Sequence, residues 1–263
     1  MQNHTYWHIQ QPTQSLYPNI EWSKPEQRAH AGRLGIIGGN KLGFAGVAEA
    51  YSTALTSGVG EARALLPDAL KPTIPKTITD TLFAPNNLSG SLSKDALPTL
   101  QALGHWAQSV LLIGDAGRNS ETAIVYEDFI RTYKGQLVIT RDAVDLLRAN
   151  APTLLDRPDT LLVVSFAQLQ KLFQSVYYPK VLTFSMQLAQ FVEALHKFTI
   201  TYPVTIAVLH REQFVIASGG EVTTTAWENP MAIWRGTIAA KAAAWWLWNP
   251  GKPLETVTTA ILQ

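Results

Sequence analysis

The stretch GRLGIIGGNKLGFAGVAEAYSTALTSGVGEARALL, residues 32–66, contains a strand, a glycine turn, a helix and a second strand in order. An apolar run at 34–37 predicts the first strand, which meets Gly38 and Gly39. Gly58 and Gly60 end the helix, and residues 62–66 predict the second strand. After Gly46, apolar residues recur at the spacing of one helix face: Val47, Ala50, Tyr51, Ala54 and Leu55.

The rest of the chain continues this alternation. Short apolar runs predict further strands at 109–115, 136–140, 160–165, 204–209 and 213–218. Helical patterns lie at 97–103, 121–133, 143–150, 166–174, 184–195 and 231–248. Continuous apolar strands alternating with helices are typical of a parallel sheet covered on both faces. We therefore expect an α/β protein with a mostly parallel central sheet. Residues 32–263 should form a single domain. The polar N-terminal extension, residues 1–31, should wrap the surface or contact another subunit.

Composition and charge exclude several classes of function. Of the 263 residues, 46% are hydrophobic and 16% charged, and the net charge is +1. The chain can bury a large core, and it lacks the basic field that attracts nucleic acid or anionic lipid. There are no cysteines, and the histidines show no metal-ligand spacing. With neither a signal-peptide pattern nor a membrane-length apolar run, we expect a cytoplasmic protein that binds no metal, nucleic acid or membrane.

Glycines gather where predicted strands end: Gly38, Gly39, Gly46, Gly114 and Gly117. Ligands of such sheets bind beyond the carboxyl ends of the strands. A glycine lets backbone amides approach a phosphate closely, and a following helix N-terminus adds partial positive charge. The spacing matches neither the dinucleotide fingerprint nor the Walker loop. The glycines indicate either tight turns alone or a ligand cleft, and two such turns on neighbouring strand ends favour the cleft.

The order of motifs over residues 28–262 resembles the ribokinase-like ADP- or ATP-dependent NAD(P)H-hydrate dehydratases. Gly38-Gly39-Asn40 and Gly46-Val47-Ala48 stand where that family has a Gly-Gly-Ser-like turn and a Gly-Ala-Pro-like helix start. VLLIGDAGRN, residues 110–119, is similar to the family's Gly-Pro-Gly-Leu-Gly-Arg turn. Asn229-Pro230 and Gly236-Thr237 are similar to its Asn-Pro and to the start of its Gly-Thr-Gly-Asp.

The resemblance implies a three-layer α/β/α ribokinase-like fold and a homo-oligomer. It implies a reaction in which ADP or ATP phosphorylates hydrated NADH or NADPH, so that elimination restores the cofactor. The implied partner is therefore an adenine nucleotide or a nicotinamide cofactor. Carried over to matching positions, it implies ligand contacts from Gly38, Gly39, Asn40, Gly46, Gly114, Gly117, Arg118, Asn229, Gly236 and Thr237.

The chain departs from the family where the resemblance places the chemistry. The family aspartate that accepts the hydroxyl proton has become Ala239, and the glycine before it has become Ile238. Lys-Gly has become His210-Arg211. Thr-Pro-His-Pro-Gly-Glu has become SFAQLQ, residues 165–170, which carries no carboxylate and no histidine. These substitutions predict a catalytically impaired or inactive relative that retains nucleotide binding.

Two alternatives stay open. Asp115 adds a negative charge to the glycine turn, and Asp142 is the one carboxylate left where the family has Asp-Ala-Asp. These two residues are the candidate catalytic groups of an active dehydratase or small-molecule kinase with a relocated carboxylate. A solvated or helix-starting role is the other interpretation of each. The remaining hypothesis is a structural or interaction protein with an empty cleft.

Two further groups of residues have an expected place in the fold. His210 is expected in a hairpin turn. Three tryptophans crowd the last long helix, which is therefore either buried on all sides or part of a subunit interface, where aromatic residues are enriched. They are Trp245, Trp246 and Trp248.

Overall fold

A ten-stranded sheet runs through the part of the chain that the computed structural model describes, residues 5–263. The strands are β1 (Trp7–Gln10), β2 (Arg33–Gly38), β3 (Glu61–Pro67), β4 (Thr81–Ala84), β5 (Ser109–Gly114), β6 (Gln136–Thr140), β7 (Thr160–Val164), β8 (Thr205–His210), β9 (Gln213–Ser218) and β10 (Glu221–Ala226). Their order across the sheet is β1-β10-β9-β8-β7-β6-β5-β2-β3-β4. Every neighbouring pair is parallel except the two that contain β9.

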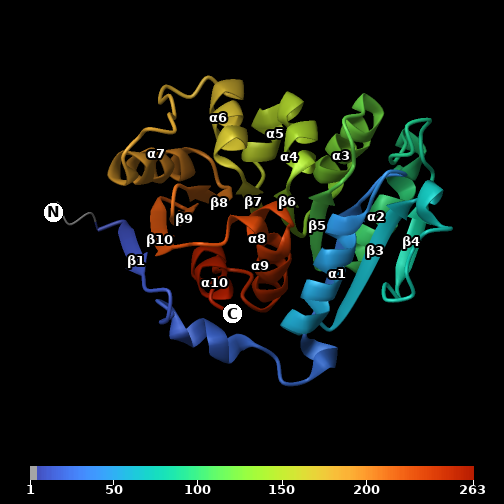
Figure 1. The fold of residues 1–263 in the computed structure, drawn as a ribbon, viewed down its shortest axis with the longest axis horizontal. Helices are drawn as coiled ribbons and strands as arrows, with labels where there is room; N and C mark the ends of the chain where they lie inside the picture. The colour runs from blue at the N-terminus through green and yellow to red at the C-terminus, as the bar shows by residue number, and fades with distance from the viewer. Residues whose placement is uncertain (1–4) are drawn as a thin grey trace.

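Helices cover both faces of this sheet (Figure 1). They are α1 (Ala45–Ser57), α2 (Leu97–Trp106), α3 (Ser120–Thr132), α4 (Asp142–Leu147), α5 (Ala151–Leu155), α6 (Phe166–Ser175), α7 (Leu188–Thr201), α8 (Pro230–Trp234), α9 (Thr237–Trp248) and α10 (Pro253–Ala260). Helices α2 to α7 pack on one face, and α1, α8, α9 and α10 pack on the other. The predicted three-layer α/β/α architecture with a mostly parallel sheet is confirmed.

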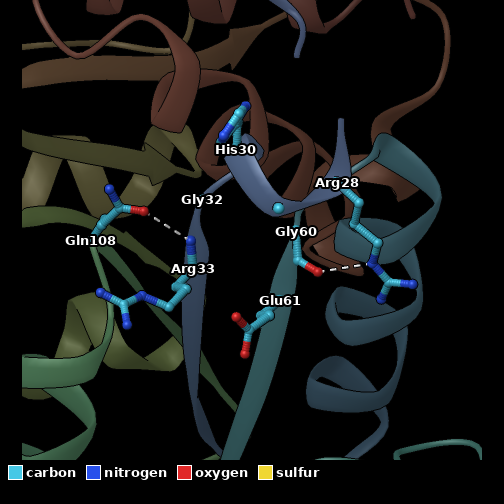
Figure 2. A pocket seen from close by; sticks show the side chains of 8 residues that line it. Arg28, His30, Gly32, Arg33, Gly60, Glu61 and Gln108 are labelled. Atoms are coloured by element: carbon cyan, nitrogen blue, oxygen red, sulfur yellow. Dashed lines mark hydrogen bonds between the residues drawn. The ribbon is translucent and has the colours of Figure 1, made fainter. Parts of the chain in front are cut away.

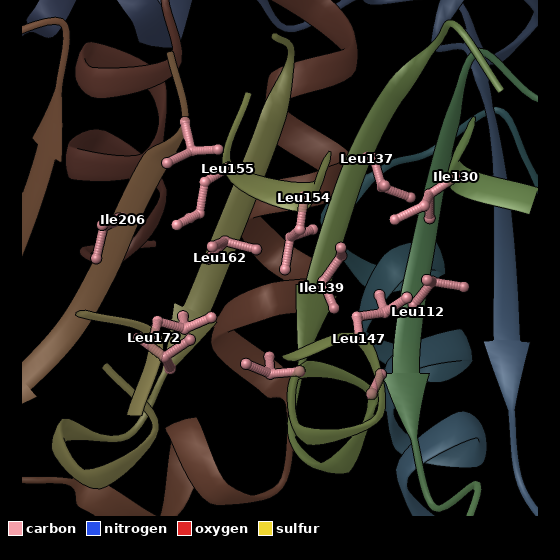
Figure 3. Close-up of a cluster of buried hydrophobic side chains, with 14 of the residues drawn as sticks. Leu112, Ile130, Leu137, Ile139, Leu147, Leu154, Leu155, Leu162, Leu172 and Ile206 are labelled. Carbon is pink, nitrogen blue, oxygen red and sulfur yellow. The ribbon is translucent and has the colours of Figure 1, made fainter. Parts of the chain in front are cut away.

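The central strands are buried on both faces, which explains their continuous apolar sequences. Leu112, Ile139 and Leu162 face the core under α2–α7, where leucines of α4, α5 and α6 pack against them (Figure 3). Their neighbours along the strands, such as Val138 and Val163, face the core under α1 and α9. Because alternate side chains of a strand point to opposite faces, each apolar run contributes to both cores.

Part of the predicted N-terminal extension belongs to the sheet, and its first four residues lie outside the described residues. The sequence predicts that this extension wraps the surface or contacts another subunit, but β1 pairs in parallel with β10 at one edge of the sheet. The Trp7 indole donates to Thr224 Oγ1 at 3.0 Å, and the buried Gln10 amide donates to the Thr258 carbonyl at 2.7 Å. The domain boundary at residue 31 stays a prediction.

The helix predicted at 231–248 is divided in the structure. Gly236 has a φ of 87°, a left-handed conformation that a glycine adopts without strain, and it separates α8 from α9. Its amide donates to the Ile233 carbonyl at 3.1 Å, which closes α8 before α9 begins in a new direction. The first turn of α9 therefore starts at a glycine that stands beside the carboxyl ends of the central strands.

The three tryptophans of α9 pack within the chain. Trp245 and Trp246 are 5% and 1% exposed. The Trp248 indole donates to the Ala31 carbonyl at 3.1 Å, and the Lys24 ammonium lies 5.8 Å from a Trp248 ring centroid. The N-terminal segment and α10 thus pack against α9, and its tryptophans have partners within the chain. A subunit interface at α9 stays a prediction.

Two residues differ from their predicted positions: Phe184 is expected in a helix and His210 in a hairpin turn. Phe184 stands in the loop before α7 and is 65% exposed, because α7 starts only at residue 188. His210 is the last residue of β8, not a turn residue, and is 1% exposed. Its ring stacks on Phe166, and its Nε2 lies 3.0 Å from the Met186 carbonyl oxygen. Burial lowers the pKa of His210 and favours the neutral imidazole.

No helix between residues 5 and 263 has both the length and the apolar character that a membrane span requires.

Candidate functional site

A cavity of about 730 Å³ lies at the carboxyl ends of β6, β7 and β8. Its apolar wall is formed by side chains of α6, α8, β8 and the loop before α7: Phe166, Phe184, Leu209, Ile233 and Trp234. The polar groups of its lining, called the polar wall here, are Asp115, Arg141, Asp142, Asp145, Gln168 and Lys171. Ligand sites are mostly apolar hollows with a few convergent polar groups, so this cavity is the first candidate.

The polar wall contains an ion pair between two strand ends. Asp115 directly follows β5 and Arg141 directly follows β6, and these strands are neighbours in the sheet. Arg141 Nη2 donates to Asp115 Oδ1, and the two side chains are 26% and 19% exposed. The second carboxylate oxygen of Asp115 accepts from the Gly46 amide at 2.6 Å. Asp115 therefore places a negative charge at the N-terminus of α1, where the helix dipole stabilises it.

Both members of the pair have an unusual backbone conformation. The φ of Asp115 is 56° and that of Arg141 is 57°. Arg141 also has a ψ of −141°, close to a region that is normally reserved for glycine. A conformation of this kind costs on the order of 1–3 kcal/mol and persists only when its surroundings fix it. The ion pair is the interaction that holds these side chains at the rim of the cavity.

The glycines around the cavity make room for the chain's own groups. A Cβ on Gly46 would lie 2.0 Å from Arg141 Nη1, and one on Gly114 would lie 2.2 Å from Asp142 Oδ1. A Cβ on Gly38 would lie 2.3 Å from the Gly114 carbonyl oxygen. These are distances that no Cβ tolerates. The structure therefore gives these three glycines a packing reason that involves no ligand.

Asp142 is a partly buried carboxyl in the wall of the cavity. Its Oδ2 accepts from the Gly117 amide at 3.0 Å. Its Oδ1 is buried and has no hydrogen-bond partner among the described residues. Burial raises the pKa of the Asp142 carboxyl above its ordinary value of 3.8, with the Gly117 hydrogen bond opposing the shift. A carboxyl with a raised pKa in a cavity is suited to proton transfer.

Other predicted site residues lie outside the lining of the large cavity. Gly39 and Asn40 tie the end of β2 to that of β5, since the Gly39 amide donates to the Gly114 carbonyl at 2.8 Å and the Asn40 side chain to the Asp115 carbonyl at 2.6 Å. Arg118 is exposed and lines a smaller adjoining cavity. Asn229 starts α8 and does not belong to the lining of the large cavity.

The start of α9 holds the residues that the sequence compares with a catalytic motif. Ala239 is fully buried in the core under α1 and α9, together with Ile238. The Thr237 hydroxyl donates to Glu49 Oε1 of α1 at 3.1 Å. Glu49 is a carboxylate that the sequence analysis misses, because its position on the helix face is visible only once α1 and α9 are packed together.

The sequence analysis also misses Arg141 and the aromatic wall. Arg141 stands where the resembled family has the alanine of its Asp-Ala-Asp motif. A large side chain in place of a small one signals that residue 141 fills space at this strand end. Phe166 is the first residue of α6, one residue beyond the end of β7, and Trp234 is the last residue of α8. Both line the cavity. The position of Trp234 at the ends of β6–β8 could not be predicted, because α8 is distant in sequence from β6 and β7 and no local pattern indicates where it packs.

A second cavity, of about 710 Å³, lies at the opposite end of the sheet (Figure 2). It is lined at the amino ends of β2 and β3 by Arg28, Ala29, His30, Gly32, Arg33, Gly60, Glu61 and Gln108. Arg28 Nε donates to the Gly60 carbonyl at 2.9 Å, and the Arg33 amide donates to Gln108 Oε1 at 3.1 Å. Open parallel sheets bind ligands at carboxyl strand ends, so the functional site is assigned to the other cavity.

Solved structures share this fold. A ribokinase-like superfamily protein from Enterococcus faecalis superposes with a TM-score of 0.75 at 14% identity, over 100% of this chain and 87% of that one. A hypothetical protein from Streptococcus mutans gives a TM-score of 0.70 at 16% identity, over 92% of this chain and 85% of that one. The chain has the ribokinase-like fold.

The dehydratase resemblance has a structural counterpart. The ADP/ATP-dependent NAD(P)H-hydrate dehydratase of Bacillus subtilis, solved with ATP and Mg²⁺, superposes on the ribokinase-like chain with a TM-score of 0.62. The identity is 12%, over 93% of this chain and 84% of that one. No family model matches the sequence. No curated protein matches it either.

We predict that Gly46→Ala destabilises the ribokinase-like fold by about 1–3 kcal/mol, because its methyl group would overlap the Arg141 guanidinium. Urea unfolding measures this cost. Gly43→Ala is the matched control, since a Cβ there meets nothing within 4 Å. In an Arg141→Gly background most of the cost should disappear. An equal cost in both backgrounds would show that the clash is not with Arg141.

A pH dependence follows from Asp142. Its folded pKa is raised, so the folded protein holds more protons than the unfolded chain just above pH 3.8. Stability should therefore fall as pH rises from that value through the higher folded pKa. Asp142→Asn should lack this component in urea unfolding between about pH 4 and about pH 8. Asp156→Asn, at an exposed aspartate, is the control. Parallel curves for wild type and Asp142→Asn would contradict the assignment.

Proposed function

We propose that this chain binds an adenine nucleotide in the cavity at the ends of β6–β8 and is a catalytically impaired relative of the ADP/ATP-dependent NAD(P)H-hydrate dehydratases. One observation carries the proposal: an apolar, aromatic cavity and a cationic side chain meet at the carboxyl ends of parallel strands in a ribokinase-like fold. The dehydratase that superposes on this chain is described with ATP and Mg²⁺, which supports the choice of ligand.

The cavity has the chemistry that a nucleotide requires. Trp234 and Phe184 are large aromatic side chains, 64% and 65% exposed, and both line it. An exposed aromatic face in a hollow is suited to stacking with a planar base. Arg141 stands on the polar wall, where its guanidinium can donate to phosphate oxygens. The base would lie against Trp234 and Phe184, and the phosphates would point toward the start of α9.

Impaired catalysis follows from the residues at that helix start. A phosphoryl-transfer site needs a group that accepts the proton of the attacking hydroxyl. Ala239 offers a methyl group instead, and that methyl group is fully buried in the apolar core under α1 and α9. Asp115 carries a carboxylate near the cavity, but that carboxylate is bound by Arg141 and by the Gly46 amide. Both of its oxygens are therefore already engaged by donors of the chain itself.

A second candidate function rests on Asp142 and Glu49. Asp142 has a raised pKa and a buried oxygen without a partner among the described residues. Glu49 hydrogen bonds to Thr237 at the start of α9. Either carboxylate could accept a proton in an active dehydratase or small-molecule kinase. If such activity is found, its loss in Asp142→Asn or in Glu49→Gln would identify the base.

We predict that ADP or ATP at about a hundredfold excess over Kd stabilises the chain by about 2.7 kcal/mol, which raises Tm by about 5–10 °C. Trp234→Ala should weaken ADP binding by about tenfold, since it removes a stacking surface. Trp22→Ala is the control, because Trp22 is 87% exposed and lies outside the cavity. No shift with ADP, ATP, NADH or NADPH would overturn nucleotide binding and favour the hypothesis of an empty cleft.

We further expect no turnover of hydrated NADH or NADPH with ADP or ATP in an assay that follows recovery of the reduced cofactor. The active dehydratase of Bacillus subtilis is the positive control. Turnover at a comparable rate would contradict impairment and favour the relocated carboxylate. The homo-oligomer and the cytoplasmic location stay predictions.

A further inference from the structure

The Arg141 guanidinium stands between two helix starts. Its Nη1 lies beside Gly46 in the first turn of α1, and its Cδ lies 3.7 Å from where a Cβ of Gly236 would be, at the start of α9. Its hydrogen bond with Asp115 involves Nη2. Its Nε and Nη1 form no hydrogen bond or ion pair with any of the described residues. A guanidinium that is 26% exposed therefore keeps donors available at the wall of the cavity.

The strained backbone of Arg141 indicates that the position of its guanidinium is fixed by the surrounding structure. An arginine at φ 57° and ψ −141° is held in a conformation that favours glycine. Strain of this kind gathers at ligand sites, where it positions a group in advance. Asp115 completes the arrangement, because it fixes one edge of the guanidinium and leaves the rest of the fork free. A rigid fork with free donors matches two oxygens of one phosphate group.

The acidic side chains around the cavity do not fit a protein-held Mg²⁺. That ion needs carboxylate oxygens that are free to coordinate it. Asp115 is bound by Arg141 and Gly46. Asp142 accepts from Gly117 through Oδ2, and its Oδ1, which has no partner among the described residues, is buried and out of reach of an ion in the cavity. Asp145 accepts from Gln168 at 2.8 Å and faces the Lys171 ammonium at 3.6 Å. Within residues 5–263, no group of three or more metal-ligating side chains gathers.

We propose that Arg141 supplies the cation that a metal ion would otherwise supply, so that this chain binds the phosphates of its ligand without a divalent metal. The identity of the ligand rests on the proposed function. The guanidinium donates to the phosphate oxygens from the side of β6, while the first amides of α9 face them from the side of Gly236. Asp115 is a positioning residue that keeps the guanidinium in place.

The test is calorimetric titration of ADP, adenosine and inorganic pyrophosphate into the full chain, once with EDTA and once with MgCl₂. ADP and pyrophosphate should bind equally well in both. Arg141→Gly should weaken both ligands by about tenfold to a hundredfold, the range expected for hydrogen bonds to charged groups. Adenosine, which has no phosphate, should be unaffected. Arg131→Gln, an exposed arginine of α3 outside the cavity, should change nothing.

The variants at residue 141 should stay folded, so that a loss of binding reports on the guanidinium rather than on unfolding. Glycine adopts the backbone conformation of residue 141 without strain, so Arg141→Gly should remain folded. The double variant Arg141→Gly/Asp115→Asn also removes the carboxylate that would be left unpaired. Arg141→Lys keeps the charge without the fork, and should bind phosphate more weakly than wild type.

The outcomes separate this inference from the proposed function. Binding of ADP that requires MgCl₂, or that is unchanged in Arg141→Gly, overturns the role of Arg141 and leaves nucleotide binding intact. Binding of pyrophosphate through Arg141 without any binding of ADP supports Arg141 and overturns the nucleotide. If neither ADP nor pyrophosphate binds, both proposals fall.

Discussion

The ion pair between Asp115 and Arg141 determines the shape of the candidate site. It exists because β5 and β6 are parallel neighbours that end at the same level, so the residues after them meet. Both side chains are largely buried, which reduces screening by water and strengthens the attraction relative to a surface pair. The Gly46 amide adds a charge-assisted hydrogen bond to the same carboxylate. The carboxyl ends of two central strands and the start of α1 are thus joined through the Asp115 carboxylate.

The fold could be predicted where strands are buried on both faces. β6 has the predicted bounds of 136–140, because a strand under two helical layers carries a continuous apolar run, here Leu137, Val138 and Ile139. The edge of the sheet carries no such pattern. β10 contains three consecutive threonines, and β4 is four residues long, so neither produces an apolar run. β1 acquires its partner from more than two hundred residues away, which local periodicity cannot reveal.

The sequence predicts the end of the sheet at which the candidate cavity lies, but of the predicted site residues only Asp115 and Asp142 line it. Gly38 and Gly114 are the last residues of β2 and β5, and Gly46 lies in the first turn of α1, so all three stand in strand-to-helix connections as predicted. A glycine in such a connection signals a close approach. The sequence cannot say what approaches, because a ligand phosphate and a neighbouring side chain exclude a Cβ in the same way. Arg141 and Asp142 occupy the space beside two of these glycines. The positive φ angles of Asp115 and Arg141 are equally hidden, because neither residue type requires them.

Gly46 and Arg141 therefore depend on each other although they are distant in the sequence. A side chain at residue 46 would displace the guanidinium, and without the guanidinium the Asp115 carboxylate would lose its partner. An uncompensated, largely buried carboxylate is costly, so the three residues depend on one another. A cleft that keeps its own cation in place is suited to an anion, which is the arrangement that the proposed function requires.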